Sequence, residues 1–292
     1  MKSQLLTAVI PVGEEHLANN RIKHWVAEAN KFSSELKLVI VFDSEKSPPS
    51  SHFEDLNLSN FEIIQGNFGS PGSARNAGQV KVDSKWLCFW DCDDEPNIES
   101  FLEMVKAAEI SGYELAIGNY EIATISEIDN STVYSHGDSL GVVANNPGIW
   151  RIAFSQKVYG DIRFEDLRMA EDQIYVLDGE FLRRKIHFDQ AVVYKYLSYE
   201  SGQLTTNTEA LKEIVTAIKL IKKRMTSGEL HIDKFSIKIL TKIYLTAIKK
   251  GSLTSKMQII LDYFKFILID RSVRIPMLKA TIEVLSNKYN RL

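Results

Sequence analysis

The chain has 292 residues, of which 45% are hydrophobic and 25% charged, an ordinary balance for a soluble globular protein. This length suffices for one large domain or a domain with an appendage, and no apolar run approaches the roughly 20 residues of a membrane-spanning helix. The two cysteines, Cys88 and Cys92, lie four residues apart. That spacing suits neither a secreted disulfide framework nor a four-ligand zinc site, so we expect a protein of the reducing cytoplasm.

The net charge of −3 hides an asymmetry along the chain. Residues 205–292 contain 17 Lys and Arg against 7 Asp and Glu, whereas the residues before them contain 18 basic and 31 acidic residues. The balance therefore changes from −13 to +10, and the last part also lacks Trp and has one Pro. We place a domain boundary near residue 204, between a first domain of residues 1–204 and a basic helical region of residues 205–292.

The first domain alternates segments typical of strands and of helices. Short apolar runs rich in β-branched and aromatic residues predict strands. These runs are 5–12, 36–42, 61–64, 86–90 and 114–117. Apolar residues at helical spacing, or a glycine-containing start, predict helices over 16–32, 73–80 and 98–111. Strands that are apolar on both faces and alternate with helices predict an α/β fold with a mostly parallel sheet covered on both sides.

The segment 125–146 is polar and rich in turn-forming residues, which predicts either a loop over the ligand site or a surface insertion. After it, the basic region is predicted to form helices over 209–225, 233–250, 255–269 and 273–290. In the second of these, Ile237, Leu240, Tyr244 and Ile248 form an apolar stripe among lysines. Such a helix either packs on its own domain, lies on an anionic membrane or mediates oligomerisation. We expect no nucleic-acid partner, because no recognised module is present.

Three carboxylates, Asp91, Asp93 and Asp94, follow the buried strand predicted at 86–90. Carboxylates this close raise one another's pKa unless a cation holds them. Mg²⁺ and Mn²⁺ take oxygen ligands, and Mg²⁺ usually completes its shell with substrate phosphates. The motif therefore predicts a clamp for a metal and a diphosphate, with an acidic turn that caps the next helix as the alternative.

A second motif spans residues 68–78, one strand before the acidic triplet. Gly69 permits a tight turn, Ser73 can cap the helix that follows, and the free N–H groups of its first turn can bind an anion. Arg75 lies in that turn, where it would reach a nucleotide. The alternative is a purely structural helix start. Since ligands bind beyond the carboxyl ends of parallel strands, Pro11, Asp43 and Asp91 are all expected at one site.

A third motif places Glu171 and Asp172 immediately before a helix-like segment, 173–177. Acidic residues in a first turn interact favourably with the helix dipole. A carboxylate in this position is alternatively a candidate general base.

In their order along the chain these motifs resemble the family 2 glycosyltransferases, inverting enzymes with the nucleotide-sugar-binding α/β fold called GT-A. The resemblance covers about the first 205 residues. Its motifs are the strand ends Val9-Ile-Pro11 and Asp43, Ala74-Arg-Asn-Ala-Gly78, Asp91-Cys-Asp-Asp94, Arg163-Phe164, Glu171-Asp172 and the tyrosine-rich Val193-Tyr-Lys-Tyr196. The chain departs from the family after Pro11, where Val12-Gly-Glu14 replaces a small residue, an aromatic and Asn, and after Asp43, where Ser44-Glu-Lys46 replaces Asp-Gly-Ser.

The resemblance implies a role for each matching position. For the donor, it implies that Pro11, Val12 and the loop at Gly69 contact the nucleotide. It also implies that Asp43 accepts a hydrogen bond from the uracil ring and that Arg75 contacts the base or the diphosphate. Asp91 would face the ribose. For the metal, Mn²⁺ or Mg²⁺, it implies Asp93 as the ligand, with Asp91 and Asp94 as further candidates. For the chemistry, it implies Asp172 as general base, with Glu171 as the second choice.

We therefore expect an inverting glycosyltransferase that moves a sugar from a UDP-sugar to a hydroxyl of a saccharide or lipid-linked saccharide. The expected setting is bacterial surface polysaccharide or glycoconjugate synthesis, in the cytoplasm or peripherally on the inner face of the membrane. One alternative is a sugar nucleotidyltransferase, although Gly13-Glu-Glu15 does not supply the basic glycine-rich loop that it needs. The other is a sugar-binding protein without activity, against which the intact Asp91, Asp93 and Asp172 argue.

Overall fold

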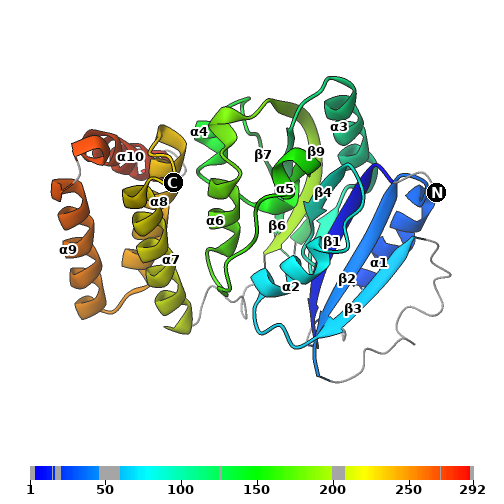
Figure 1. Ribbon diagram of the computed structural model, residues 1–292, viewed down its shortest axis with the longest axis horizontal. Coiled ribbons are helices and arrows are strands. Elements are labelled where there is room, and N and C mark those ends of the chain that lie inside the picture. The colour runs from blue at the N-terminus through cyan, green and yellow to red at the C-terminus, as the bar shows by residue number, and fades with distance from the viewer. Residues whose placement is uncertain are drawn as a thin grey trace. The chain divides into compact units, whose positions relative to one another are not determined.

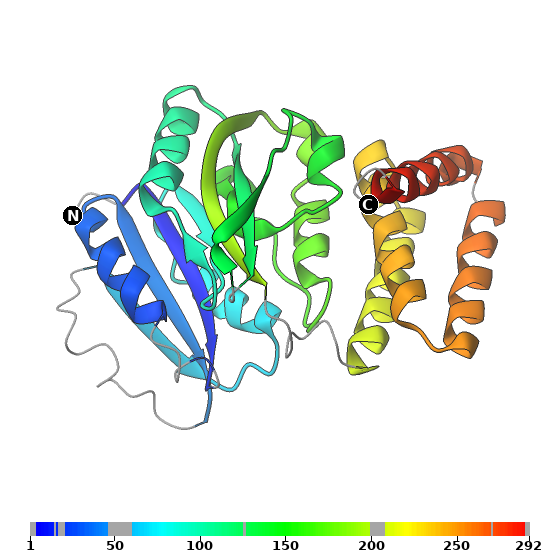
Figure 2. The same ribbon diagram turned by 180° about the vertical axis from the view of Figure 1, so that it is seen from behind.

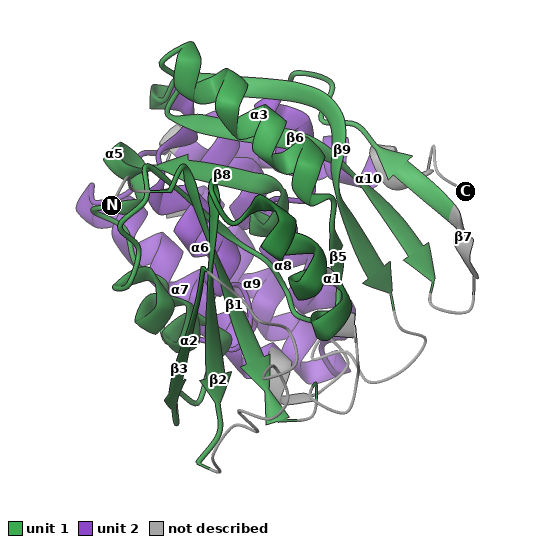
Figure 3. Ribbon diagram, turned by 90° about the vertical axis from the view of Figure 1, so that its right-hand side faces the viewer, with its two compact units in different colours: residues 1–138, 148–166, 183–202 green, residues 139–147, 167–182, 203–292 purple. Residues whose placement is uncertain are grey.

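The computed structural model describes residues 4–14, 16, 21–45, 60–124, 127–198, 208–269 and 271–289. Figure 1 shows the order of the elements along the chain. They belong to two compact units: residues 1–138, 148–166 and 183–202 form the first, and residues 139–147, 167–182 and 203–292 the second (Figure 3). The boundary expected near residue 204 lies outside the described residues. The second unit also takes two earlier segments that the sequence analysis placed in the first domain.

The first unit contains a mixed sheet in the strand order β3-β2-β1-β4-β8-β6-β9-β5, with β7 paired to β6. Its strands are β1 (Leu6–Gly13), β2 (Leu36–Asp43), β3 (Phe61–Gly66), β4 (Trp86–Phe89), β5 (Glu95–Pro96), β6 (Leu115–Thr124), β7 (Glu127–Tyr134), β8 (Ile152–Ser155) and β9 (Ile186–Ser198). From β3 to β4 the strands are parallel, as expected for apolar strands separated by helices. Strand β8 runs antiparallel to both β4 and β6, and β6 pairs in parallel with β9.

Helices cover both faces of this sheet (Figures 1 and 2). On one face lie α1 (Arg21–Ala29), continued by a 3-10 turn (Asn30–Phe32), and α3 (Ile98–Ile110). On the other face lies α2 (Pro71–Gln79), followed later in the chain by α5 (Gln156–Tyr159). The side chain of Gln79 donates to the carbonyl of Tyr159 at 2.6 Å and so links the two helices. The expected helix-covered α/β architecture is thus confirmed.

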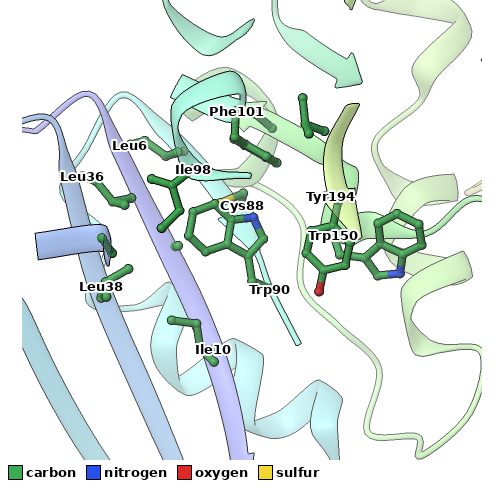
Figure 4. Packing of buried hydrophobic residues seen from close by; sticks show 14 of the residues in the cluster. Leu6, Ile10, Leu36, Leu38, Cys88, Trp90, Ile98, Phe101, Trp150 and Tyr194 are labelled. Atoms are coloured by element: carbon green, nitrogen blue, oxygen red, sulfur yellow. The ribbon is translucent and has the colours of Figure 1, made fainter. Parts of the chain in front are cut away.

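The main core of the first unit lies between the sheet and α1 and α3 (Figure 4). Alternate residues of β1 point into it, including Leu6 and Ile10, which are fully buried. Trp90, directly after β4, packs edge-on against Phe101 of α3 with ring centroids 5.3 Å apart. The residues that precede the acidic triplet are therefore fixed by the largest apolar side chains of the core.

Part of the segment 125–146, expected to be either a loop over the ligand site or a surface insertion, forms strand β7 (Glu127–Tyr134). Strand β6 continues to Thr124, well past the expected end at Ile117, and β7 pairs antiparallel with it. The tyrosines Tyr120 and Tyr134 stack across this pair with centroids 5.2 Å apart. Among the described strands β7 pairs only with β6, so it is an edge strand that needs no apolar run. Its polar composition therefore gave no strand signal.

The second unit is helical. It comprises α4 (Leu140–Val143), α6 (Glu171–Asp178), α7 (Thr208–Ser227), α8 (Lys234–Lys250), α9 (Leu253–Ile269) and α10 (Arg271–Tyr289). Most of the apolar stripe of α8 is internal, because Ile237, Leu240 and Tyr244 are at most 2% exposed, while Ile248 is half-buried. Of the alternatives for this stripe, packing within its own unit is the one observed. None of the described helices is long and apolar enough to cross a membrane.

Helix α6 is part of this helical core. Its Asp178 accepts from Arg224 of α7 at 2.8 Å, and Phe181, which follows α6, stacks on Phe235 of α8 at 5.5 Å. Ile174 and Tyr175 are buried. The short segment 167–182 is therefore held by helices that lie later in the sequence.

Candidate active site

Several predicted ligand-binding residues meet at one edge of the sheet. In the parallel register, Gly13 at the end of β1 lies opposite Asp43 at the end of β2, and Val12 lies opposite Phe42. Strand β4 flanks β1 on its other side, with Phe89 opposite Val9, so Asp91 follows at the same edge. The structure thus brings the strand ends at Pro11, Val12, Asp43 and Asp91 together.

Asp43 organises the loop between β3 and α2. Its Oδ1 accepts from the backbone N–H of Phe68 at 2.7 Å and from that of Gly69 at 3.4 Å. Gly69 has a φ of +75°, a conformation that side chains disfavour, which explains the glycine. The second oxygen, Oδ2, accepts from none of the residues that the structure describes. Asp43 therefore shapes the loop through one oxygen, and contact of the other with a nucleotide stays a prediction.

The start of α2 is already supplied with negative charge by the chain itself. Ser70 caps the helix by accepting from the Ser73 N–H at 3.2 Å. The hydroxyls of Ser70 and Ser73 in turn donate to Oδ1 of Asp166, at 2.6 and 2.9 Å. A carboxylate at a helix N-terminus is electrostatically favourable. The chain itself therefore places the carboxylate of Asp166 beside this helix start, and anion binding there stays a prediction.

The rest of the α2 motif joins the helix to its surroundings. Arg75, 6% exposed, donates from Nη2 to Oδ1 of Asp91 at 2.8 Å and lies over the ring of Phe164 at 5.5 Å. Asn76 makes two hydrogen bonds with the Phe164 backbone, at 2.8 and 2.9 Å. A Cβ on Gly78 would lie 2.4 Å from Cγ1 of Val9, so α2 approaches the sheet too closely for a side chain there. This motif thus places a guanidinium beside the acidic triplet.

The acidic triplet is hydrogen-bonded to β9. Tyr194 of β9 accepts from the Asp91 N–H at 3.0 Å and donates to Oδ2 of Asp94 at 3.0 Å, while the Leu197 N–H donates to Oδ1 of Asp94 at 2.8 Å. Asp94 is only 1% exposed. Burial, then the charges of Asp91 and Asp93, raise the pKa of Asp94 well above its ordinary value, and its two hydrogen bonds oppose that shift. Both carboxylate oxygens of Asp94 are therefore engaged by β9.

The remaining carboxylates, Asp91 and Asp93, stay partly exposed. In the described part of the chain no group of three His, Cys, Asp or Glu side chains is arranged to hold an ion. Two carboxylates nevertheless match the way proteins bind Mg²⁺, through one or two carboxylates together with substrate phosphates and water. The donor set at Asp91 and Asp93 fits a metal that arrives with its nucleotide.

The contacts of Tyr194, Asn76 and Asp166 hold the site together, and the sequence motifs did not predict them. The tyrosine-rich segment was a signal for Tyr194, but its pairing with Asp94 depends on a contact 100 positions away in the sequence. The tryptophans near the site belong to the core: Trp90 is fully buried, and Trp150 stacks on Tyr194 with centroids 4.6 Å apart. Neither presents a sugar-stacking surface.

The acidic pair predicted as base belongs to the second unit, at the first turn of α6. Ala170 precedes it with a φ of +69°. Glu171 is 7% exposed, whereas Asp172 is half-buried, and Oδ1 of Asp172 accepts from the Gln173 N–H at 2.8 Å. Of the two residues, Asp172 is the more exposed. The role of either residue as base stays a prediction.

The sequence matches the model of the family "Glycosyl transferase family 2" over residues 8–169, more than half of the chain. The chain belongs to this family, as its motifs indicated. No curated protein matches the sequence significantly.

Solved structures share the fold. S. aureus TarS 1–349 superposes with a TM-score of 0.66 at 14% identity, over 99% of this chain and 92% of that one. The same protein in complex with UDP-GlcNAc gives 0.67 at 13% identity, over 98% and 92%. The longer TarS structure gives 0.64 at 15% identity, over 96% of this chain and 55% of that one. The GT-A-like α/β fold with C-terminal helices is thereby confirmed.

Proposed function

We propose that this protein transfers a sugar from a UDP-sugar to a hydroxyl group with inversion at the sugar carbon. The observation that carries the proposal is the carboxylate of Asp43, one oxygen of which is engaged by the loop at Phe68 while the other accepts from no described residue. A uracil ring offers an N–H donor to such an acceptor. The TarS complex with UDP-GlcNAc supports a uridine nucleotide, since a protein of this fold binds one.

The acidic turn would hold the diphosphate end of the donor. Asp93 together with Asp91 would bind Mn²⁺ or Mg²⁺, and the metal, when bound, would offset negative charge on the departing diphosphate. Arg75 orients Asp91 through their 2.8 Å ion pair and adds a fixed positive charge beside it. Tyr194 and Asp94 hold the backbone of the turn in place, so the ligating groups are preorganised.

Inversion requires a base that takes the proton of the acceptor hydroxyl while the diphosphate leaves from the opposite side of the sugar. We propose Asp172 for this role and Glu171 as the alternative. The acceptor we propose is a saccharide or lipid-linked saccharide of a bacterial surface polysaccharide or glycoconjugate, handled in the cytoplasm. The two alternatives from the sequence, nucleotidyl transfer and sugar binding without activity, gain no support from the family match.

Calorimetry with UDP tests the proposed donor site. We expect UDP binding in the presence of Mn²⁺ and a loss of roughly tenfold or more in affinity in EDTA or in Asp93→Ala. Asp83→Ala is the matched control, because it removes a carboxylate that is 69% exposed and follows α2. Equal affinity with and without metal would exclude the clamp, and absence of UDP binding under all conditions would exclude the donor. Hydrolysis of a panel of nucleotide sugars then identifies the donor.

A further inference from the structure

Large apolar side chains are exposed mainly on the last two helices. Of the 15 strongly exposed large hydrophobic residues in the described part of the chain, ten lie on α9 and α10. The α9 stripe consists of Leu253, Met257, Ile260, Leu261, Phe264 and Leu268, which are 37–78% exposed. The α10 stripe consists of Ile275, Leu278, Ile282 and Leu285, which are 44–69% exposed. Apolar exposure gathered in this way marks an interaction surface.

The outward face of α9 is apolar although its inward face already packs. At helical spacing the six residues of the α9 stripe lie along one side, whereas Ile259, Tyr263 and Phe266 are buried within the unit. Tyr263 contacts α8 through Tyr244, with centroids 5.2 Å apart, and α10 through Thr281, at 2.6 Å. An ordinary surface helix is polar on the side that faces away from its core. The α9 stripe therefore needs a second apolar partner.

Positive charge surrounds these stripes. On a helical wheel, Lys256 and Lys265 border the α9 stripe on its two sides. The nearby acidic residues are neutralised from within the unit, Asp262 by Lys222 at 2.7 Å and Glu283 by Lys238. Residues 205–292 carry an excess of ten positive charges, part of which is offset within the second unit, as by the ion pair of Arg224 with Asp178. The remaining positive charge can attract an anionic partner.

We propose that the α9 and α10 stripes bind the surface of an anionic lipid bilayer. The apolar side chains would enter the boundary between head groups and acyl chains, and Lys256 and Lys265 would extend to lipid phosphates. Charge selects this partner over a second copy of the chain, because two copies would bring two strongly basic regions together. The inference is independent of sugar transfer, although it would bring the enzyme to lipid-linked acceptors.

Vesicle sedimentation of the full chain tests this proposal. We expect binding to vesicles of phosphatidylcholine with phosphatidylglycerol, release at high salt, and little binding to phosphatidylcholine alone. Replacing Met257, Leu261 and Phe264 together by Gln should lower partitioning roughly 100-fold. The matched control, Val80→Gln with Ile110→Gln, changes residues of the first unit that are 72% and 85% exposed and should bind normally. Circular dichroism confirms that each variant is folded.

Two results would overturn the proposal: failure of the wild-type chain to bind anionic vesicles, or unchanged binding of the triple variant. A dimer in sedimentation velocity that the triple variant abolishes, without any vesicle binding, would assign the stripes to a second copy instead.

A fluorescent label gives an independent readout. The two native cysteines are buried, so a cysteine introduced by Phe264→Cys can be labelled selectively with an environment-sensitive dye. Its emission should shift to the blue when anionic vesicles are added, whereas the same dye on Ile110→Cys should not respond. Identical spectra with and without vesicles would contradict insertion of the α9 stripe.

Discussion

Asp91, Asp93 and Asp94 are near neighbours with different surroundings. Both oxygens of Asp94 are used by β9, Asp91 is paired with Arg75, and Asp93 is partly exposed. Their mutual repulsion is reduced by one nearby guanidinium and by the raised pKa of the buried member. The carboxylates of the motif that remain partly exposed are therefore those of Asp91 and Asp93.

The predicted base is testable by a substitution that keeps its shape. Asp172→Asn retains the size of the side chain but cannot accept a proton, so donor binding should survive while transfer falls by on the order of 100-fold or more. Glu171→Gln should harm transfer less, because Glu171 is buried at the helix start. Rates from a transfer assay, with UDP affinity measured alongside, separate these effects. Loss in Glu171→Gln alone would exchange the two roles, and full activity in both variants would place the base elsewhere.

At this scale the sequence predicted which residues gather but not what each one contacts. Strand ends are readable from apolar runs, so Asp43 and Asp91 could be placed at one edge. The partner of Arg75 depends on how α2 packs, and the partner of Asp94 depends on β9. Such side-chain contacts are set by tertiary packing and have no local pattern.

Among the elements, the helices of the second unit are joined by a polar cluster that gives a pH-dependent stability. Asp262 of α9 accepts from Lys222 of α7 at 2.7 and 2.8 Å and from Tyr244 of α8 at 2.6 Å. Burial alone would raise the pKa of Asp262, but these hydrogen bonds outweigh it and lower the pKa. With a lowered folded pKa, the stabilisation is present above the unfolded value of about 4 and disappears as the pH falls below it.

Asp262→Asn should therefore lower the free energy of unfolding at pH 7 by on the order of 1 kcal/mol, since this carboxylate is 46% exposed and partly screened. Near pH 3 the wild-type and variant stabilities should converge. Thermal unfolding followed by circular dichroism at both pH values measures the difference. Asp161→Asn, at an exposed carboxylate of the first unit, is the control and should change neither value. An equal loss at both pH values would mean that the cluster acts through packing instead of charge.

The elements themselves were largely readable from the sequence. Long apolar or amphipathic segments such as β2 and α8 match their expected ranges closely, because burial forces their composition. Strand β7 was missed because an edge strand is specified by its neighbour β6 and not by its own side chains. The exposed apolar face of α9 was not predicted either, because a sequence rich in Ile, Leu and Phe does not indicate which side of the helix is buried.

On the scale of the whole molecule, the second unit is assembled from three separate segments. A chain truncated after Leu204 would retain α6 but lose α7 and α8, which cover Phe181 and pair with Asp178. We expect such a chain to bind UDP while residues 171–177 exchange their amide hydrogens freely and sugar transfer is lost. Hydrogen exchange with mass spectrometry, compared with the full chain, measures this.

Supplying residues 205–292 as a separate polypeptide is the matching control, and it should restore protection of α6 at high concentration. If the truncated chain protected α6 as well as the full chain does, the helix would be stable without its later partners, and the boundary near residue 204 would separate two independently folding parts.

The discontinuous second unit also bears on how the protein is made. A ribosome releases residues 167–182 before α7 and α8, so the nascent chain must leave Phe181 without its stacking partner Phe235 until α8 has emerged. The sheet can form meanwhile, because its strands end with β9 at Ser198. If Asp172 is the base, the growing polypeptide would form its donor site first. It could transfer sugar only after α7 and α8 had been synthesised and had packed against α6.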